Sequence, residues 1–170
     1  MILKGLVDED IANYKKTSMF LIFPFCTFKC EKDCGKNICQ NSSIVKQQNI
    51  EVTPEALCER YLHNPLTTAV VCGGLEPFDS RFDLLSFVNC LRIKYSCEDD
   101  IVVYTGYTEE ELNNPELIEQ HFIFENLKSY SNIIVKFGRY IPDEEKRFDE
   151  VLGVTLASKN QYAKRLINEL

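Results

Sequence analysis

Short apolar runs alternate along the chain with segments whose apolar residues recur at helical spacing. The run Ser18–Phe25 is rich in aromatic and β-branched residues, which makes it long enough for a buried strand and too short for a typical helix. Similar runs predict four further strands at Thr67–Cys72, Ile101–Tyr104, Ile133–Phe137 and Val151–Leu156.

Helices are predicted between these strands. Thr53 and Pro54 are typical of an N-cap followed by the first helical position, and this helix is expected to close near residues 63–65. The apolar positions from Leu84 to Tyr95 mark one face of a second helix. Thr108 and Glu111 form a capping box that starts a third, and residues 160–170 are predicted to form a C-terminal helix.

The alternation of strands and helices predicts an α/β fold with a mainly parallel sheet, whose ligand site lies beyond the carboxyl ends of the strands. A complete eight-stranded barrel needs roughly 250 residues. The 170 residues of this chain therefore predict one domain, 1–170, built as a partial, open (β/α) barrel.

Charge and hydropathy narrow the classes of function. The net charge of −7 and the lack of a basic stripe exclude the electrostatic pattern of nonspecific nucleic-acid binding. The longest apolar run, Met19–Cys26, is interrupted by Pro24 and is much shorter than the ~20 residues of a membrane span, so no membrane partner is expected. The acidic residues that follow Val7 do not resemble the apolar region of a secretory signal, and we expect a cytoplasmic protein.

Eight cysteines are the main chemical feature of the sequence. In the reducing cytosol, clustered cysteines more often bind metal or do redox chemistry than form disulfides. Four of them fall in one polar loop, residues 26–41, at Cys26, Cys30, Cys34 and Cys39. The others lie singly in apolar segments and are expected to act as small buried hydrophobes: Cys58, Cys72, Cys90 and Cys97. The loop fits either an iron–sulfur cluster or a four-thiolate zinc site.

Two further motifs follow strands. Gly73-Gly74-Leu75-Glu76-Pro77 comes after the second strand, and Tyr104-Thr105-Gly106-Tyr107 comes after the third. Each has a purely structural explanation, because glycines favour tight turns and Thr108 can cap the next helix. Their common position at strand ends places both motifs at the expected ligand edge, together with the cysteine loop.

On these residues the chain resembles the radical S-adenosylmethionine (SAM) family, and within it the activating proteins of anaerobic ribonucleotide reductase. The family pattern is C-x3-C-x2-C, and in the activating proteins the third cysteine is commonly followed by an aromatic residue and Asn. Here only Cys39 has an Asn at that distance, Asn41. The resemblance therefore implies that Cys26, Cys30 and Cys39 bind the cluster, with an enlarged second spacing and with Cys34 as the rival third ligand.

The resemblance also implies cofactor contacts. The glycine motif resembles the family's Gly-Gly-Glu-Pro, with Leu75 inserted, and residues 136–140 and 157–161 resemble its Asp-Gly-Arg-Phe and Ser-Ser-Asn-Gln segments, with Phe137 in place of Asp. Ser158 and Asn160 are equally well explained as N-caps of the predicted C-terminal helix. The implied SAM-binding residues are Gly73, Gly74, Glu76, Thr105, Ser158 and Asn160.

Three thiolates on a 4Fe-4S cluster leave one iron without a protein ligand, whereas electron-transfer clusters have four cysteines. In the family that iron binds SAM, and reductive cleavage gives a 5'-deoxyadenosyl radical. The resemblance implies transfer of this radical to a glycyl radical enzyme such as anaerobic ribonucleotide reductase, a cytosolic reductant as electron source, and no catalytic side chain beyond the cluster ligands. Two alternatives stay open: a zinc-binding structural or interaction module that uses all four loop cysteines, and a cluster-binding sensor or electron carrier that does not cleave SAM.

Overall fold

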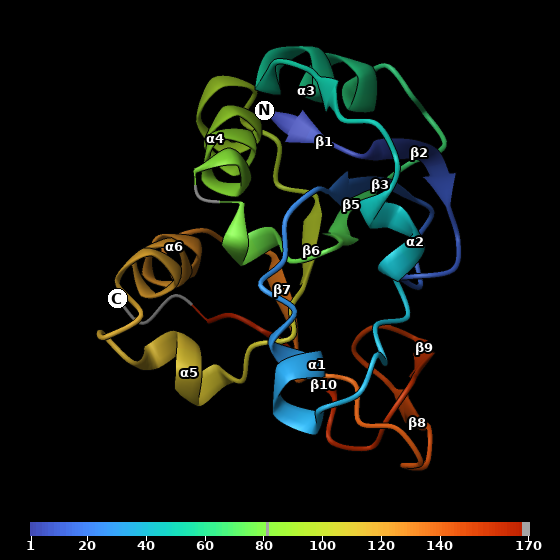
Figure 1. Cartoon of the computed structure of the whole chain (residues 1–170). Coiled ribbons are helices and arrows are strands. Elements are labelled where there is room, and N and C mark those ends of the chain that lie inside the picture. The colour runs from blue at the N-terminus through green and yellow to red at the C-terminus, as the bar shows by residue number, and fades with distance from the viewer. Residues whose placement is uncertain (81, 168–170) are drawn as a thin grey trace.

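An open six-stranded sheet forms the centre of the molecule in the computed structural model, which describes residues 1–80 and 82–167 (Figure 1). The strand order is β10-β7-β6-β5-β3-β2. Four inner strands are parallel, namely β3 (Ser18–Phe23), β5 (Ala69–Gly74), β6 (Asp100–Tyr104) and β7 (Ile133–Phe137). The two edge strands, β2 (Gly5–Asp10) and β10 (Tyr162–Arg165), pair antiparallel with their neighbours. The fold is thus mixed α/β with a mostly parallel sheet, and the described residues form no closed barrel.

Helices connect the parallel strands, as expected for crossovers between parallel neighbours. The main ones are α3 (Pro54–Leu62), α4 (Asp83–Asn89), which continues as the π-helical turn η2 (Cys90–Lys94), and α6 (Ile118–Lys128). Shorter elements are α1 (Lys29–Cys34), α2 (Ser42–Val45), η1 (Pro77–Asp79), α5 (Glu109–Asn113), and the strand pairs β1 (Ile2–Leu3) with β4 (Ile50–Glu51) and β8 (Arg147–Asp149) with β9 (Val154–Leu156). None of the helices in the described residues has the length and apolar character needed to cross a bilayer.

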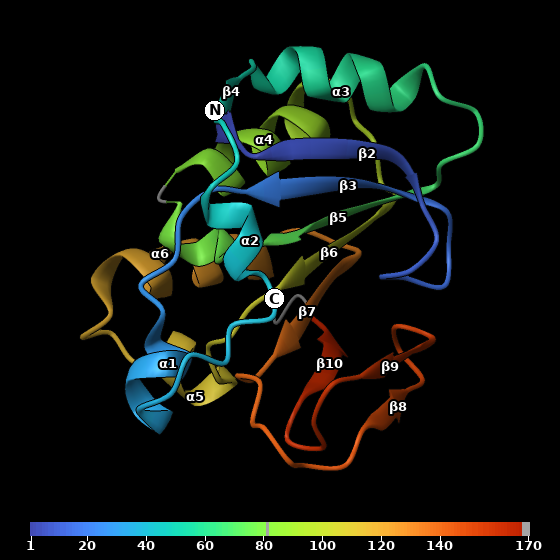
Figure 2. The ribbon, with the colours of Figure 1, turned by 45° about the vertical axis from the view of Figure 1, so that its right-hand side comes forward.

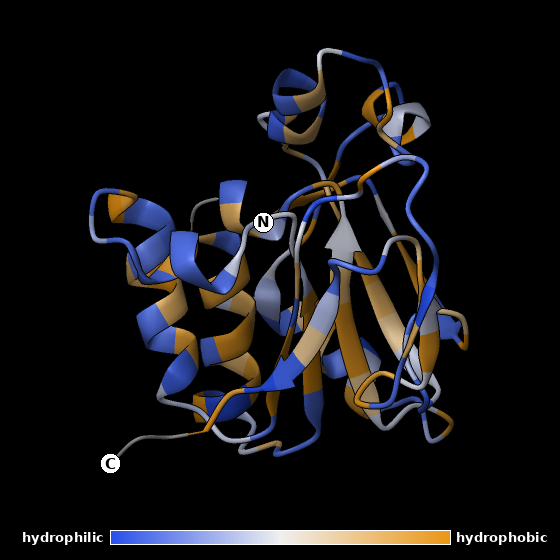
Figure 3. Ribbon diagram, turned by 90° about the horizontal axis from the view of Figure 1, so that it is seen from below, coloured by the Kyte–Doolittle hydropathy of each residue, from blue (hydrophilic) through white to orange (hydrophobic). Residues whose placement is uncertain are grey.

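The two faces of the sheet are covered differently. Because successive side chains of a strand point to opposite faces, alternate residues such as Val70 and Val71 enter different cores. Val70 belongs to the larger core, which the sheet forms with α3, α4 and α6. Val71 belongs to a smaller core with Tyr14 and Leu152, from the β2–β3 loop and the β8–β9 hairpin. Figure 3 shows orange apolar residues between the helices and the sheet and blue residues on the outer helix faces.

Most of the predicted elements are confirmed within a few residues. The first four strands correspond to β3, β5, β6 and β7, and the helices predicted after Thr53, across Leu84–Tyr95 and after Thr108 correspond to α3, α4 with η2, and α5. Thr53 and Thr108 cap their helices through hydrogen bonds from the backbone amides of Ala56 and Glu111. The strand predicted at Val151–Leu156 is shortened to β9, and it pairs with β8 outside the central sheet.

The predicted C-terminal helix over residues 160–170 is wrong for the residues that can be described. Tyr162–Arg165 forms β10 along the edge of β7, and residues 168–170 lie outside the described chain. Strand pairing prevails because the free edge of β7 offers backbone partners, and the register continues to Leu166, whose amide donates to Ile133. Asp149 adds a further acceptor, since its carboxylate takes the backbone N–H of Ala163 at 2.9 Å.

Strand β2 is an element that the sequence pattern did not predict. Its acidic residues Asp8, Glu9 and Asp10 obscure the strand pattern, yet an edge strand tolerates charge on its exposed side and such charge opposes pairing with other chains. Arg60 of α3 binds Asp8 through two contacts of 2.6 Å, which holds this edge against the helix layer.

Candidate functional site

A cavity of about 530 Å³ lies beyond the carboxyl ends of β3, β5, β6 and β7. Figure 2 shows the cysteine loop, with α1 and α2, past the arrowheads of β3 and β5. The β8–β9 hairpin and the β2–β3 loop supply other parts of the wall. Among the lining residues are Ala12, Asn13, Phe20, Cys26, Cys30, Cys39, Asn41, Gly73, Gly74, Glu76, Tyr104, Thr105, Lys136, Arg139, Thr155 and Gln161. This is the edge at which a parallel sheet is expected to bind its ligand.

Three of the four loop cysteines line this cavity. Cys26 and Cys30 are separated by one turn, in which Phe28 adopts the left-handed conformation with a φ of 53°. Cys39 approaches from the far end of the loop. Cys34 lies outside the cavity lining, where its exposed thiol contacts the carbonyl oxygens of Glu31 and Lys36 at 3.6 and 3.4 Å. The cavity therefore brings together the three cysteines of the predicted ligand set.

Burial favours the protonated thiols of Cys26 and Cys30 when no metal is bound. Burial raises the pKa of Cys26 to about 12, although the backbone amide of Phe28 donates to its sulfur at 3.2 Å. Burial also raises the pKa of Cys30, and the neighbouring Cys39 adds to this effect. Because thiolates are the metal-binding form, binding of a metal or cluster must release these protons.

The start of the cysteine loop is fixed by Asp79 of η1. One carboxylate oxygen accepts the backbone N–H of Thr27 at 2.8 Å, and the other accepts the Tyr107 hydroxyl at 2.7 Å. Tyr107 was not assigned a catalytic role from sequence, and the structure gives it this structural contact. The first ligand segment is thereby attached to the ends of both β5 and β6.

A second anchor is centred on Glu111 of α5. Its carboxylate binds Lys29 at 2.6 Å and both terminal nitrogens of Arg139 at 2.9 Å, and it accepts the backbone amide of Thr108 at 3.0 Å. Arg139 also approaches Asp33 of α1 at 3.5 Å. Burial alone would raise the pKa of Glu111, but the contacts with Arg139 and Lys29 outweigh it and lower this pKa to about 2. A carboxylate that is charged at neutral pH thus ties α1 to the ends of β6 and β7.

Gly73 and Gly74 are required by close packing between strands. A Cβ on Gly74 would lie 2.6 Å from Cγ2 and 3.1 Å from Cα of Ile22, and its φ of 88° suits glycine. A Cβ on Gly73 would lie 2.9 Å from the ring of Phe20. The Gly74 carbonyl accepts the Asn41 side-chain amide at 2.6 Å, which attaches the end of the cysteine loop to β5.

Glu76 is buried beneath the cavity and bridges two strand ends. Its two oxygens accept the backbone amides of Gly106 at 2.8 Å and Phe78 at 3.2 Å. Burial raises the pKa of Glu76 to about 7, while the Gly106 amide and the Thr105 hydroxyl lower it in part. A carboxylate can accept about four hydrogen bonds, so Glu76 retains capacity for a ligand donor. Thr105 also lines the cavity.

Lys136 is a site residue that sequence reasoning missed. It lies at the end of β7, is 7% exposed and lines the cavity, and its Nζ donates to the Gly138 carbonyl at 2.8 Å. Burial lowers the pKa of Lys136 to about 8, and the charge of Glu76 opposes this shift. A lysine one residue before the end of an otherwise apolar strand, Ile133–Phe137, is the sequence signal that could have identified it.

Ser158 and Asn160 are placed differently from the other predicted cofactor residues. Neither belongs to the described cavity lining. The buried Ser158 hydroxyl accepts the Ile141 amide at 3.3 Å, and the Asn160 side chain donates to the Arg139 carbonyl at 2.9 Å. Their interpretation as helix caps is wrong because β10, a strand, follows them. Both residues hold the loop after β7, while Gln161 beside them faces the cavity.

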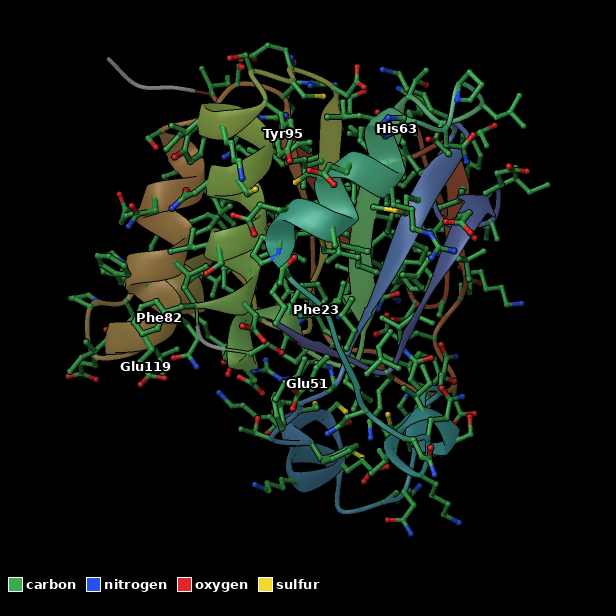
Figure 4. All side chains as sticks on the ribbon, turned by 90° about the horizontal axis from the view of Figure 1, so that it is seen from above. Phe23, Glu51, His63, Phe82, Tyr95 and Glu119 are labelled. Carbon is green, nitrogen blue, oxygen red and sulfur yellow. The ribbon has the colours of Figure 1, made fainter. Side chains whose placement is uncertain are left out.

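The remaining cysteines and histidines lie away from this site. Cys58, Cys72 and Cys90 are buried in the helix-side core, and Cys97 is partly buried against it, as expected for small hydrophobes. Figure 4 shows His63 and Tyr95 toward the end of the sheet opposite the cysteine loop, which lies beyond Phe23 and Glu51. The His121 ring contacts the Leu112 carbonyl at 2.9 Å.

The three cavity cysteines are a donor set that an iron–sulfur cluster could use. Within residues 1–80 and 82–167, no group of three or more His, Cys, Asp and Glu side chains is arranged to hold one metal ion. A 4Fe-4S cluster distributes its thiolates over different irons, and three thiols around one cavity match that need. Lys29, Lys136 and Arg139 also line the cavity and offset the negative charge of thiolates.

Comparison with known families gives one finding. A family model described as a 4Fe-4S single cluster domain matches residues 17–161, a range that includes the cysteine loop and the other cavity-lining residues named above except Ala12 and Asn13. Comparison with curated proteins and with solved structures gives no significant match.

Proposed function

The chain belongs to the 4Fe-4S single cluster domain family, and on that premise we propose that it is a radical SAM protein. Cys26, Cys30 and Cys39 would hold the cluster, and SAM would occupy the rest of the cavity. When bound, the reduced cluster supplies the electron that splits the SAM sulfonium into methionine and a 5'-deoxyadenosyl radical. The protein supplies binding, orientation and a site partly enclosed by its own loops.

The observation that carries this proposal is the separation of Cys34 from the other three loop cysteines. Only those three belong to the described cavity lining, and Cys34 lies exposed at the end of α1. Three protein thiolates leave one iron free for a second ligand, which an electron carrier with four cysteine ligands lacks. This arrangement also argues against the zinc module, which needs all four thiolates on one ion.

Charges at the cavity support an amino-acid ligand. SAM carries an α-ammonium and an α-carboxylate, and the cavity offers Glu76 and Lys136 as groups of opposite charge. The carboxylate is an acceptor suited to the ammonium, and the buried lysine has donors left for the carboxylate. Thr105 and the backbone of Gly73 and Gly74 complete this wall.

We further propose that the open sheet is the partial (β/α) barrel of radical SAM proteins and that the radical acceptor is a protein, such as a glycyl radical enzyme of the anaerobic ribonucleotide reductase type. A cytosolic reductant would supply the electron. The acceptor assignment rests on the resemblance of the motifs.

Electron paramagnetic resonance tests the function directly. The protein is reconstituted anaerobically with iron and sulfide, reduced with dithionite, and measured with and without SAM. We expect a reduced 4Fe-4S signal that changes when SAM is added. A signal indifferent to SAM would favour a sensor or electron carrier, and one equivalent of zinc without a cluster would establish the structural module.

Matched serine variants test the ligand assignment. Cys39→Ser is expected to lose iron on gel filtration after reconstitution, whereas Cys34→Ser is expected to retain it. The reverse pattern would make Cys34 the third ligand.

A further inference from the structure

The eight residues between Cys30 and Cys39 raise a geometric question. Helix α1 ends at Cys34, and Gly35 turns the chain in the left-handed conformation with a φ of 66°. Cys34 is closer than Cys39 to Cys30 in sequence. It would be the expected third ligand if the chain continued away from the cavity after Gly35. The chain nevertheless returns, and Cys39 reaches the cavity wall.

Glu31 accounts for this return. It follows Cys30 directly, in the first turn of α1, and its Oε1 accepts the backbone N–H of Cys39 at 3.0 Å. The carboxylate therefore links the residue after the second ligand to the backbone of the third ligand. A hydrogen bond to a charged acceptor is stronger than one between neutral groups.

The neighbouring contacts make Glu31 the link between two fixed parts of the loop. On one side, α1 is held by Lys29 and Asp33, which contact Glu111 and Arg139. On the other side, Asn41 is attached to the Gly74 carbonyl at 2.6 Å. The segment that ends at Cys39 lies between these anchors. The contact between Glu31 and the Cys39 backbone amide fixes the position of Cys39 relative to Cys30.

We propose that Glu31 is a positioning residue that selects Cys39 rather than Cys34 as the third cluster ligand, acting through the backbone amide of Cys39. This inference rests on the cluster-binding part of the proposed function. It needs neither SAM cleavage nor a particular radical acceptor.

Three substitutions separate the hydrogen bond from charge and size. Glu31→Ala removes the acceptor, Glu31→Asp keeps the charge on a shorter side chain, and Glu31→Gln keeps an amide oxygen at the same reach. Lys32→Ala, an exposed truncation on the same helix, is the matched control. Each protein is reconstituted anaerobically, and iron loss to an excess of a ferrous chelator is followed by absorbance.

We expect Glu31→Ala and Glu31→Asp to lose iron at least about tenfold faster than the wild type, because the third ligand is no longer held in place. Glu31→Gln is expected to remain within about threefold of the wild type, since its amide oxygen can accept the same N–H. Lys32→Ala is expected to match the wild type. The reduced cluster spectrum of Glu31→Gln should also match that of the wild type.

Adding Cys34→Ser to Glu31→Asp tests ligand selection itself. If the loosened loop lets Cys34 substitute for Cys39, the double variant loses iron faster than Glu31→Asp, whereas Cys34→Ser alone loses it at the wild-type rate. Thermal unfolding of the cluster-free proteins by circular dichroism shows whether each variant is folded, and Glu31→Gln and Glu31→Asp keep the comparison interpretable if Glu31→Ala does not fold.

Iron retention by all Glu31 variants at the wild-type rate would overturn the proposal. Equal loss in Glu31→Gln and Glu31→Ala would also overturn it, because charge would then matter instead of the hydrogen bond. Failure of the proposed function gives a different result, in which the wild type itself binds no cluster or its cluster does not respond to SAM.

Discussion

Replacing Glu111 with Gln tests the anchor that joins α1 to the sheet. The substitution keeps the size of the side chain and an oxygen that can still cap α5, but removes the negative charge. Lys29 and Arg139 would then face an uncharged amide at contacts that now measure 2.6 and 2.9 Å. We expect the folded state to be destabilised because two cations lose their counter-charge.

The magnitude follows from the pKa of this carboxyl. Lowering the pKa of Glu111 from 4.5 to about 2 corresponds to at most about 3.4 kcal/mol of folding free energy at neutral pH. The Glu111 side chain is 24% exposed and that of Lys29 is 44% exposed, so solvent screening reduces this value. We expect a loss of about 1.5 kcal/mol, which for a chain of this size lowers Tm by about 5 °C.

The assay is thermal unfolding of the cluster-free protein by circular dichroism under reducing conditions, with Glu110→Gln on the exposed side of α5 as the matched control. Because the folded-state pKa of Glu111 lies below its unfolded value, the stabilisation is complete above about pH 4.5 and is lost as the pH falls toward 2. The difference in Tm between the wild type and Glu111→Gln should therefore be largest at pH 7 and shrink below pH 4.5. A difference under about 1 °C at pH 7, or one that stays constant into acid, would refute this reasoning.

Two further substitutions test other parts of the cavity. Gly74→Ala introduces a Cβ 2.6 Å from Ile22 at a φ of 88°. We therefore expect the free energy of unfolding, measured in urea, to fall by at least about 2 kcal/mol. A variant as stable as the wild type would contradict the close packing between β3 and β5. Lys136→Met removes the buried amine while keeping a side chain of nearly the same length. We expect SAM affinity, measured by equilibrium binding, to fall at least about tenfold while the iron content is unchanged. An unchanged SAM affinity would exclude the proposed contact between Lys136 and the SAM carboxylate.

The positions of the main site segments could be predicted because they depend on local patterns. Apolar runs mark the strands, and parallel strand ends meet at one edge, so the cysteine loop, Gly73-Gly74 and Thr105 were expected together. Which strands pair with each other could not be predicted from local patterns. The segment Tyr162–Arg165 contains residues that also suit a helix, and only the free edge of β7, distant in sequence, makes it a strand.

The same limit applies to single side chains. Spacing alone left Cys34 and Cys39 as alternatives, because the choice depends on contacts such as Asn41 with Gly74 that join distant parts of the chain. Lys136 was missed because its burial depends on the strand end and the cavity around it rather than on its neighbours in sequence. Ser158 and Asn160 were assigned by motif, and neither belongs to the described cavity lining.

The order of the cavity-lining residues along the chain affects when a cluster can be inserted. Its lining begins at Ala12 and ends at Gln161, so the three cysteines leave the ribosome well before the residues that close the site around them. Until those residues have been added and folded, β7, β9 and the Arg139 anchor are missing. A cluster delivered before these segments have folded would meet an unshielded loop, so we expect stable insertion to follow the packing of β7 and β9.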